Sequence, residues 1–113
     1  MVKKYIPNQG DLIYIDLKPT KGHEQNGKRP AIVISNNIFN LKTNMCIVCP
    51  ISSNIKSFPT HYILEDSRKI KGAVLCEHIR SIDYSSRNAK PIEKASDNDL
   101  LSVIMLTNAC IEE

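Results

Sequence analysis

The feature that most constrains this chain is its series of short apolar runs, each rich in β-branched residues and closed by turn-forming or charged residues. Runs of this length and spacing predict short strands rather than alternating strands and helices. Strands are expected over residues 11–17, 30–35, 45–51, 60–64, 73–77 and 79–84, the last two being separate strands or one bent strand. Alternation in the first run places Leu12 and Tyr14 on one face and Ile13 on the other.

The pattern becomes helical near the C-terminus. Ser96 is a good N-cap, and Asp99 stands three residues later, as in a capping box. Apolar side chains then recur along one face and extend beyond it: Leu100, Leu101, Val103, Ile104 and Met105, with Thr107 in line. A helix that is apolar over so much of its circumference must be buried on two sides, so we expect it to pack on the sheet and on a second subunit. Residues 36–43 are expected to hold a short helical turn.

These elements together predict a mainly β fold, a small and partly open barrel with a C-terminal helix. The 113 residues allow one domain, spanning residues 1–113. The core should be aliphatic, because aromatic residues make up only 5% of the chain and Trp is absent. The net charge of +3 suits an anionic partner but does not identify one.

The sequence shows no sign of export or membrane insertion, because the N-terminus lacks an apolar signal segment and no run is long enough to span a bilayer. We therefore expect a cytoplasmic protein with its four cysteines reduced. Cys46 and Cys49 form a C-x-x-C, but residues three apart on a strand point to opposite faces and cannot share a metal ion. They are expected to be buried structural thiols.

The segment KGHEQNGKRP, residues 21–30, carries the first candidate site on the loop between two predicted strands. Pro30 confines Arg29 to extended backbone, so the guanidinium is held at a fixed loop-to-strand junction. A planar, permanently charged donor group in such a place suits a phosphate. The alternative interpretation is a surface arginine that is solvated or paired with Glu24.

A second set of polar side chains follows the predicted strand 45–51. Ser52 and Ser53 come directly after that strand, and Asn54 and Lys56 add hydrogen-bond donors. A hydroxyl at a strand end can serve catalysis or simply cap the loop. His61 falls inside a predicted strand and is expected to be structural.

The string GDLIYIDLKPTKGHEQNGKRPAIVIS resembles the opening of the MazF/PemK toxin family. That family has a G-D strand followed by P-x-x-G-x-E-Q-x-G-x-R-P and an apolar strand. PISSNIKSFPTHYIL resembles its strand, polar loop and P-x-x-V/I strand, and CEHIRSIDY its E/D-Q-V/I-R/K-S/T-I/L segment. The resemblance covers nearly the whole chain without large gaps.

The resemblance implies an SH3-like barrel of the MazF, Kid and CcdB type, with one or two short helices besides the C-terminal one, working as a homodimer. It implies an endoribonuclease that cuts single-stranded mRNA at a short sequence without a metal or cofactor, leaving 2′,3′-cyclic phosphate and 5′-hydroxyl ends. Translation and growth would thereby be inhibited. A cognate MazE-like antitoxin with an acidic, disordered tail would fill the RNA groove at the subunit interface.

Position by position, the resemblance makes Arg29 the catalytic arginine and Ser52 the counterpart of the family's catalytic threonine. Glu24 matches an acidic residue needed for activity in some members. His23 matches the histidine of a branch that includes the Kid toxin. Ser52 keeps the hydroxyl of threonine and loses only the methyl that stiffens χ1, so function is expected to survive.

The Kid-type triad is incomplete, because Glu77 stands at its Asp position but Leu75 replaces its Arg. A centre built on Arg29 and Ser52 is therefore favoured. His78 replaces a glutamine implied to touch RNA bases, so base preference is expected to differ from that of relatives. The expected RNA contacts are Lys21, Gln25, Lys28, Ser53, Asn54, Lys56, Glu77, His78 and Arg80.

RNA can be cut without a metal because its 2′-hydroxyl is a built-in nucleophile. Arg29 would stabilise the charge that develops on phosphorus, and Ser52 would donate to a non-bridging oxygen. Glu24, or a neutral His23, would take the 2′-hydroxyl proton.

Two other interpretations stay open at this point. One is a binding-only poison of the same fold, of the CcdB type, which blocks DNA gyrase. The other is a relative whose activity has eroded. The fold does not separate these classes. The loop sequence and a hydroxyl opposite Arg29 favour the ribonuclease.

Overall fold

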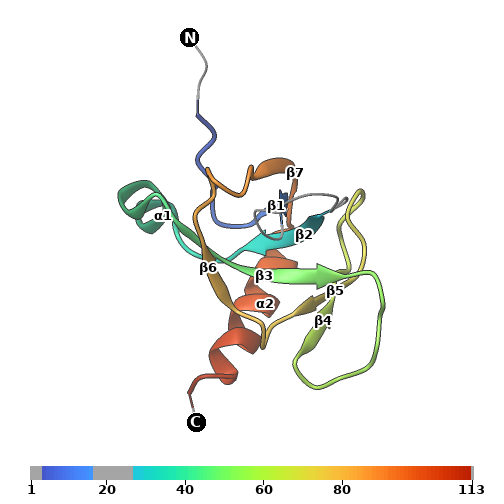
Figure 1. The fold of residues 1–113 in the computed structure, drawn as a ribbon. Coiled ribbons are helices and arrows are strands. Elements are labelled where there is room, and N and C mark those ends of the chain that lie inside the picture. The colour runs from blue at the N-terminus through green and yellow to red at the C-terminus, as the bar shows by residue number, and fades with distance from the viewer. Residues whose placement is uncertain (1–3, 17–26, 113) are drawn as a thin grey trace.

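A computed structural model describes residues 4–16 and 27–112 of the chain (Figure 1). The described residues form seven strands and two helices in the order β1 (Asp11–Asp16), β2 (Lys28–Val33), α1 (Asn37–Thr43), β3 (Cys46–Ser52), β4 (His61–Ile63), β5 (Ala73–Leu75), β6 (Arg80–Ile82), β7 (Lys90–Lys94) and α2 (Asp97–Ala109). The expected mainly β fold with a C-terminal helix is confirmed. The helical turn expected over residues 36–43 is a seven-residue helix, with Asn36 as its N-cap.

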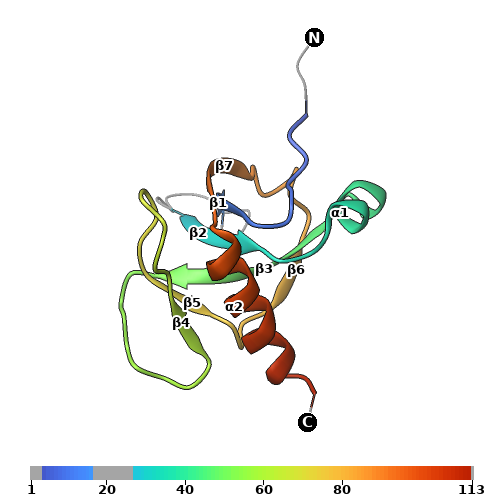
Figure 2. The same ribbon diagram turned by 180° about the vertical axis from the view of Figure 1, so that it is seen from behind.

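All the strand pairs are antiparallel, in the order β4-β5-β3-β2-β1-β7, and β6 pairs with the first half of β3. Among the described strands, β4 and β7 lie at the two ends of this path, so the sheet is open rather than closed. Helix α2 lies across one face of the sheet, and α1 lies at the side away from β4 and β5 (Figures 1 and 2).

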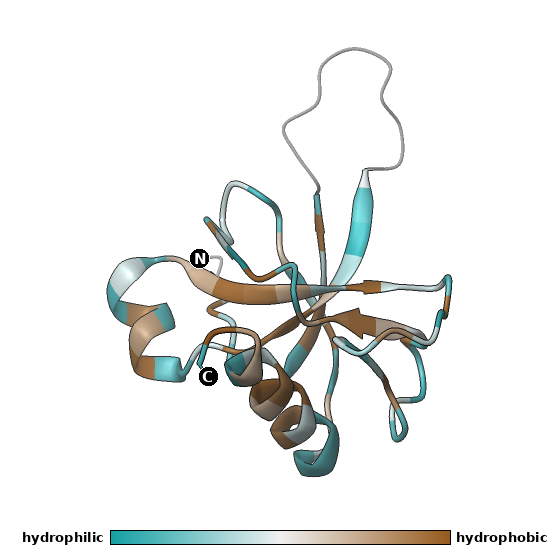
Figure 3. Cartoon of the chain, turned by 90° about the horizontal axis from the view of Figure 1, so that it is seen from below, coloured by the Kyte–Doolittle hydropathy of each residue, from teal (hydrophilic) through white to brown (hydrophobic). Residues whose placement is uncertain are grey.

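The sheet has a buried apolar cluster on each face. The first cluster includes Leu12, Ile32, Ile51 and Val74 together with Val103 of α2. The second lies on the opposite face and contains Ile13, Ile15, Ala31, Val33, Cys46, Val48, Ile82 and Tyr84. Hydrophobic residues accordingly mark the central strands and much of the C-terminal helix (Figure 3). The predicted separation of Leu12 from Ile13 is confirmed.

The two cysteines of the C-x-x-C belong to different clusters, as the strand spacing predicts. Cys46 lies in the second cluster and Cys49 in the first, both fully buried. Burial raises the pKa of Cys46 to about 12 and that of Cys49 to about 11, so both remain protonated thiols at neutral pH. The described ranges contain no group of three or more metal-ligating side chains, and no described helix is long and apolar enough to cross a membrane.

The second strand differs from its predicted bounds. It begins at Lys28 and ends at Val33, so Lys28 and Arg29 belong to the strand rather than to the loop. The reason is its pairing with β1, which aligns Asp16 with Lys28 and Ile15 with Arg29. Pairing with β3 starts only at Ala31, so Pro30 lies where β2 has one hydrogen-bonded neighbour and its missing N–H is tolerated.

The capping box at the start of α2 is only half formed. The Asp99 N–H donates to the Ser96 hydroxyl at 3.0 Å, as expected. The Asp99 carboxylate is fully buried and accepts instead from the Tyr62 hydroxyl at 2.6 Å and from the backbone N–H groups of Glu65 and Asp66. Asp99 therefore ties α2 to the segment that joins β4 and β5.

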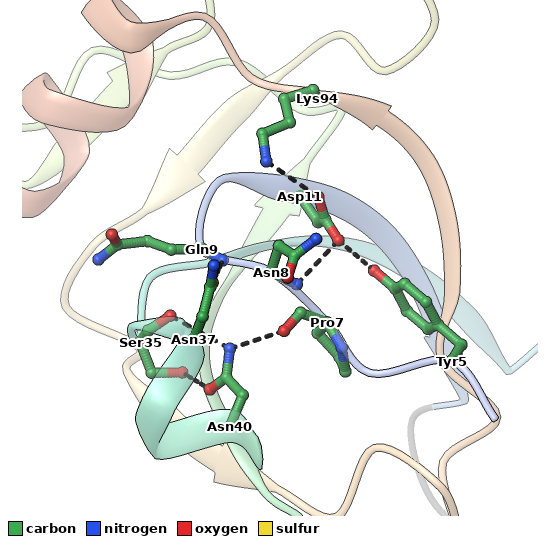
Figure 4. Close-up of polar contacts among 9 residues, drawn as sticks. All are labelled: Tyr5, Pro7, Asn8, Gln9, Asp11, Ser35, Asn37, Asn40 and Lys94. Carbon is green, nitrogen blue, oxygen red and sulfur yellow. Dashed lines mark hydrogen bonds and ion pairs between the residues drawn. The ribbon is translucent and has the colours of Figure 1, made fainter.

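A buried amide fastens α1 to the N-terminal segment (Figure 4). Asn40 is fully buried, and its side-chain nitrogen donates to the backbone carbonyls of Pro7 and Ser35. Asp11 nearby accepts from the Tyr5 hydroxyl and the Asn8 N–H. These contacts fix the start of β1, which pairs with β2 and so sets the position of Arg29.

Candidate active site

Arg29 and Ser52 lie at adjacent ends of neighbouring strands. The β2–β3 pairing ends with Ala31 opposite Pro50, and Arg29 and Ser52 each lie two residues beyond these partners at the same end of the strand pair. Ala31 and Val48 point into the second cluster, and Arg29 and Ser52 are an even number of residues from them along their strands. Alternation therefore places both side chains on that face of the sheet, opposite α2.

The Ser52 side chain is oriented by its own loop. Its Oγ accepts the backbone N–H of Asn54 at 3.1 Å, and the residue is partly exposed at the last position of β3. No described acceptor takes the hydroxyl hydrogen, so this hydrogen can be donated to a ligand. The sequence expectation of a hydroxyl at a strand end is confirmed, with the strand extending one residue further than predicted.

Gly72 packs directly against the Ser52 backbone. The strand pair β3–β5 aligns Ser52 with Ala73, which brings Gly72 against the Ser52 backbone. A Cβ at position 72 would stand 2.3 Å from the Ser52 carbonyl oxygen, and the φ of Gly72 is +144°. Only glycine allows this backbone approach without displacing Ser52.

Arg29 is exposed and available to a ligand. No ion pair within residues 4–16 and 27–112 involves its guanidinium. The alternative pairing with Glu24 falls outside the described residues, as do the expected site residues His23, Lys21 and Gln25.

Apart from Glu77 and His78, the other expected RNA contacts lie in three places. Ser53, Asn54 and Lys56 are exposed in the segment that follows β3, and Lys28 is exposed at the start of β2. Arg80 is exposed on β6, paired with Val48 and hence on the same face of the sheet as Ser52. Among these basic residues, Arg80 shares the face of Arg29 and Ser52, whereas Lys28 alternates to the other face of β2.

Glu77 contacts His78, Thr60, which the sequence analysis did not select, and His61, which it expected to be structural. The Glu77 carboxylate accepts from the Thr60 hydroxyl at 2.6 Å and contacts His61 Nε2 at 3.0 Å. Desolvation opposes ionisation of Glu77, but these hydrogen bonds outweigh it and hold the pKa of the carboxyl below its ordinary value. The signal that could have found Thr60 and His61 is the β4–β5 register, which aligns His61 with Leu75.

Comparison with known proteins assigns the chain to a family. The family described as PemK-like, MazF-like toxin of type II toxin-antitoxin system matches residues 8–106. The chain belongs to this family. The resemblance carried by the G-x-E-Q-x-G-x-R-P segment is thereby confirmed, and the match extends through both strands of the candidate site and most of α2.

Individual relatives of this MazF-like family agree over most of their length. The chain is 40% identical to the endoribonuclease toxin MazF of Escherichia coli (strain K12) over 89 residues, 79% of each chain. It is 32% identical to the endoribonuclease toxin ChpB of the same strain, covering 99% of this chain and 100% of ChpB. The crystal structure of a MazE–MazF complex from Deinococcus radiodurans (Form-III) superposes with a TM-score of 0.83 at 31% identity, covering 93% of this chain and 95% of that one.

Proposed function

We propose that this chain is the toxin of a type II toxin–antitoxin pair and acts as a sequence-specific endoribonuclease on single-stranded mRNA, inhibiting translation and growth in the cytoplasm. One observation carries the proposal: an exposed arginine at the start of β2 and a hydroxyl with an available hydrogen at the end of β3 lie at adjacent ends of two paired strands, on one face of the sheet. The similarity to endoribonucleases MazF and ChpB supports the choice of RNA as substrate.

The reaction is an attack of the 2′-oxygen on the adjacent phosphorus. The 2′-O–P bond forms, the P–O5′ bond breaks, and the products are a 2′,3′-cyclic phosphate and a 5′-hydroxyl. The Arg29 guanidinium stabilises the added negative charge on the phosphoryl oxygens and donates a hydrogen bond to the leaving 5′-oxygen, which takes its proton from solvent. Ser52, oriented by the Asn54 N–H, donates its hydroxyl hydrogen to a non-bridging oxygen. None of these steps calls for a metal or cofactor.

The proton of the 2′-hydroxyl needs an acceptor. Arg29 is unsuited to that role because guanidinium does not lose its proton at ordinary pH. We assign the role to Glu24 or to a neutral His23, both of which lie outside the described residues. Glu77 is a poorer candidate, because its hydrogen bonds with Thr60 and His61 hold the pKa of its carboxyl below the ordinary value and so make it a weaker base.

A binding-only poison of the same fold would not require this pair. Such a protein needs a complementary surface, whereas Gly72 and Asn54 serve specifically to place the Ser52 backbone and hydroxyl. The intact arrangement favours the ribonuclease.

The RNA backbone is proposed to follow the basic side chains on the face of Arg29 and Ser52. Arg80 would contact phosphates there, with Lys56 from the segment after β3 and Lys28 from the edge at the start of β2, while Ser53 and Asn54 donate hydrogen bonds and Lys21 and Gln25 contribute from the preceding loop. Contacts of this kind make affinity fall steeply with salt concentration.

Two protein partners are proposed. The first is a MazE-like antitoxin whose acidic tail competes with RNA for the basic face, in line with the similarity to a MazE–MazF complex. The second is another copy of this chain. Leu101 and Met105 lie one turn apart on α2 and are 59% and 62% exposed, which leaves an apolar patch for a homodimer to bury.

The test is cleavage of a long single-stranded RNA in EDTA by the purified protein and its Arg29→Ala variant, with the ends of every fragment mapped. We expect discrete cuts ending in cyclic phosphate, slowed on the order of 10²–10³-fold in the variant. Arg68→Ala removes an exposed arginine of the β4–β5 segment and serves as the charge-matched control with wild-type activity. RNA left intact by the wild type, or cut equally fast by Arg29→Ala, would refute the proposal.

A further inference from the structure

Four side chains from the β4–β5 hairpin form what we call the Glu77 cluster: Thr60, His61, Glu77 and His78. The segment that follows β3 adds an aromatic ring, because the centroid of Phe58 lies 4.9 Å from that of His61 with the planes tilted by 42°. Phe58 is 55% exposed. The cluster and the ring therefore make a continuous, partly open strip on the surface.

The Glu77 carboxylate is fixed but not saturated. Oε1 accepts from the Thr60 hydroxyl at 2.6 Å, and Oε2 lies 3.0 Å from His61 Nε2 and 3.5 Å from His78 Nε2. A carboxylate has about four lone-pair sites, so capacity for at least one further donor remains. The side chain is 31% exposed, which lets a ligand reach it.

His61 contacts the Glu77 carboxylate through Nε2 and is the more buried of the two histidines in the cluster. Its side chain is 15% exposed, and its Nδ1 is buried with no hydrogen-bond partner among the described residues. The hydrogen-bond network therefore assigns the ring proton to Nε2, where it is donated to Glu77. His61 cannot itself reach a ligand through Nδ1, so its effect on a ligand passes through Glu77.

The strand register puts the cluster beside the candidate active site. Ser52 pairs with Ala73, and His61 pairs with Leu75 two residues further along β5. All four positions therefore share one face of the sheet. Ser52 on β3 and His61 on β4 are separated by two strand spacings, with β5 between them, and by two residues along the strand direction. This separation corresponds to roughly 12 Å, a distance that a neighbouring nucleotide of the same RNA can span.

We propose that the Glu77 cluster is a nucleobase subsite that prefers bases with an exocyclic amino group, namely adenine, cytosine or guanine, over uracil. The inference rests on the proposed ribonuclease function. Phe58 stacks the base, Glu77 accepts a hydrogen bond from its amino group, and His61 is a positioning residue for Glu77.

The chemistry of the carboxylate selects this ligand. Glu77 repels phosphate, so it cannot serve the RNA backbone, and it repels the acidic tail of an antitoxin equally. A carboxylate accepts hydrogen bonds but donates none, which matches an amino group on a Watson–Crick edge. Uracil presents its single N–H between two carbonyl oxygens and has no amino group to offer.

The first experiment compares cut-site profiles of the wild type and Glu77→Gln on one RNA pool with randomised sequence. We expect wild-type cuts to favour amino-bearing bases over uracil at one position near the cut. Glu77→Gln should weaken that preference on the order of 10-fold at this position and leave the other positions unchanged. Ratios between sites within one reaction do not depend on the fraction of folded enzyme.

The positioning role of His61 is tested by a matched pair of variants. His61→Phe keeps the ring against Phe58 but loses the donor, so it should reproduce the change of preference seen in Glu77→Gln. His61→Gln restores an N–H donor and should recover the wild-type profile. A purely structural His61 would lower the overall rate in both variants without altering the preference at one position.

The outcomes separate the two proposals. A wild type that leaves RNA intact refutes the ribonuclease itself. If the wild type cuts RNA and Glu77→Gln has the same cut-site profile, the subsite alone is overturned. The same conclusion holds if Glu77→Gln loses antitoxin binding but keeps the wild-type profile. If Glu77→Gln does not fold, wild-type enzyme is tested on RNA with inosine for guanosine or purine riboside for adenosine at the preferred position. Equal cutting of the analogue overturns the subsite, and a loss of cutting supports it.

Discussion

At the scale of single residues, the Ser52 carbonyl leaves no room for a side chain at position 72. A Cβ there would lie 2.3 Å from this oxygen, and the positive φ of Gly72 is itself unfavourable for other residues. We expect Gly72→Ala to lower the free energy of unfolding by about 1–3 kcal/mol or more and to displace Ser52. The rate of cleavage per folded molecule should fall at least tenfold, because a displaced Ser52 no longer donates its hydrogen bond to the phosphate. Urea unfolding and single-turnover cleavage measure the two effects.

Gly10→Ala is the matched control for this substitution. Gly10 also has a positive φ, of +94°. A Cβ at position 10 would lie 3.2 Å from Cδ2 of Leu100, which is the end of a flexible side chain and not backbone. Gly10→Ala should therefore cost stability without changing cleavage per folded molecule. Equal effects of both substitutions on cleavage would show that Gly72 has no special relation to Ser52.

The placement of Arg29 and Ser52 at strand ends could be predicted from sequence, but the contacts that surround them could not. Arg29 and Ser52 stand next to recognisable local signals, a following proline and a preceding apolar run. Thr60 and His61 meet Glu77 only through the β4–β5 register, which depends on the whole sheet. Gly72 likewise becomes necessary only when β5 is laid against β3.

At the scale of elements, one buried carboxylate joins α2 to the sheet. Asp99 accepts three hydrogen bonds from the hairpin side, including one from Tyr62, and desolvation together with this bond raises the pKa of Tyr62 to about 12. Asp99→Asn turns an amide N–H towards these donors and should cost about 2–4 kcal/mol of unfolding free energy, since bonds to charged groups contribute roughly 1.5–3 each. Denaturant unfolding measures the loss.

Asp97→Asn is the control for Asp99→Asn, because Asp97 is exposed in the same first turn of the helix. It should change the unfolding free energy by less than about 1 kcal/mol, the contribution of a charge near a helix N-terminus. A similar loss in both variants would mean that Asp99 acts only on the helix dipole and not as the link to β4 and β5.

The elements that sequence predicts well are those with an internal pattern. Strand β1 alternates, β3 is continuously apolar, and α2 has its N-cap, so each is found within one or two residues of its place. Strand β7 was not predicted, because KPIEK has one apolar residue and a proline and owes its conformation to pairing with β1. Lysines and proline are also what an edge strand tolerates.

At the scale of the whole molecule, the two faces of the sheet differ in what covers them. One face is covered by α2 and holds the first cluster (Figure 2). The other carries the second cluster, and beyond it the Arg29–Ser52 pair and the Glu77 cluster reach the surface. Substitutions on the outer side of α2 can therefore alter assembly without touching the residues proposed to bind RNA.

The outer side of α2 gives the last prediction. Leu101 and Met105 are exposed in the single chain, so burial against a second copy would stabilise a homodimer in proportion to the apolar area covered. The wild type is expected to sediment at about twice 12.7 kDa, and the double variant Leu101→Lys, Met105→Lys at the single-chain mass. Burying two unpaired lysine charges in an apolar interface costs more free energy than the burial of apolar area there contributes.

The control for this prediction introduces a single lysine at an exposed apolar side chain of α1. Ile38 on α1 is 68% exposed, and α1 lies at the other side of the molecule from β4 and β5 (Figure 1). Ile38→Lys should leave the mass unchanged. Because these side chains are exposed in the single chain, the lysine variants should keep their fold by circular dichroism, so a change in mass reports assembly alone. A wild type of single-chain mass, or dissociation by Ile38→Lys instead, would place the interface elsewhere or remove it.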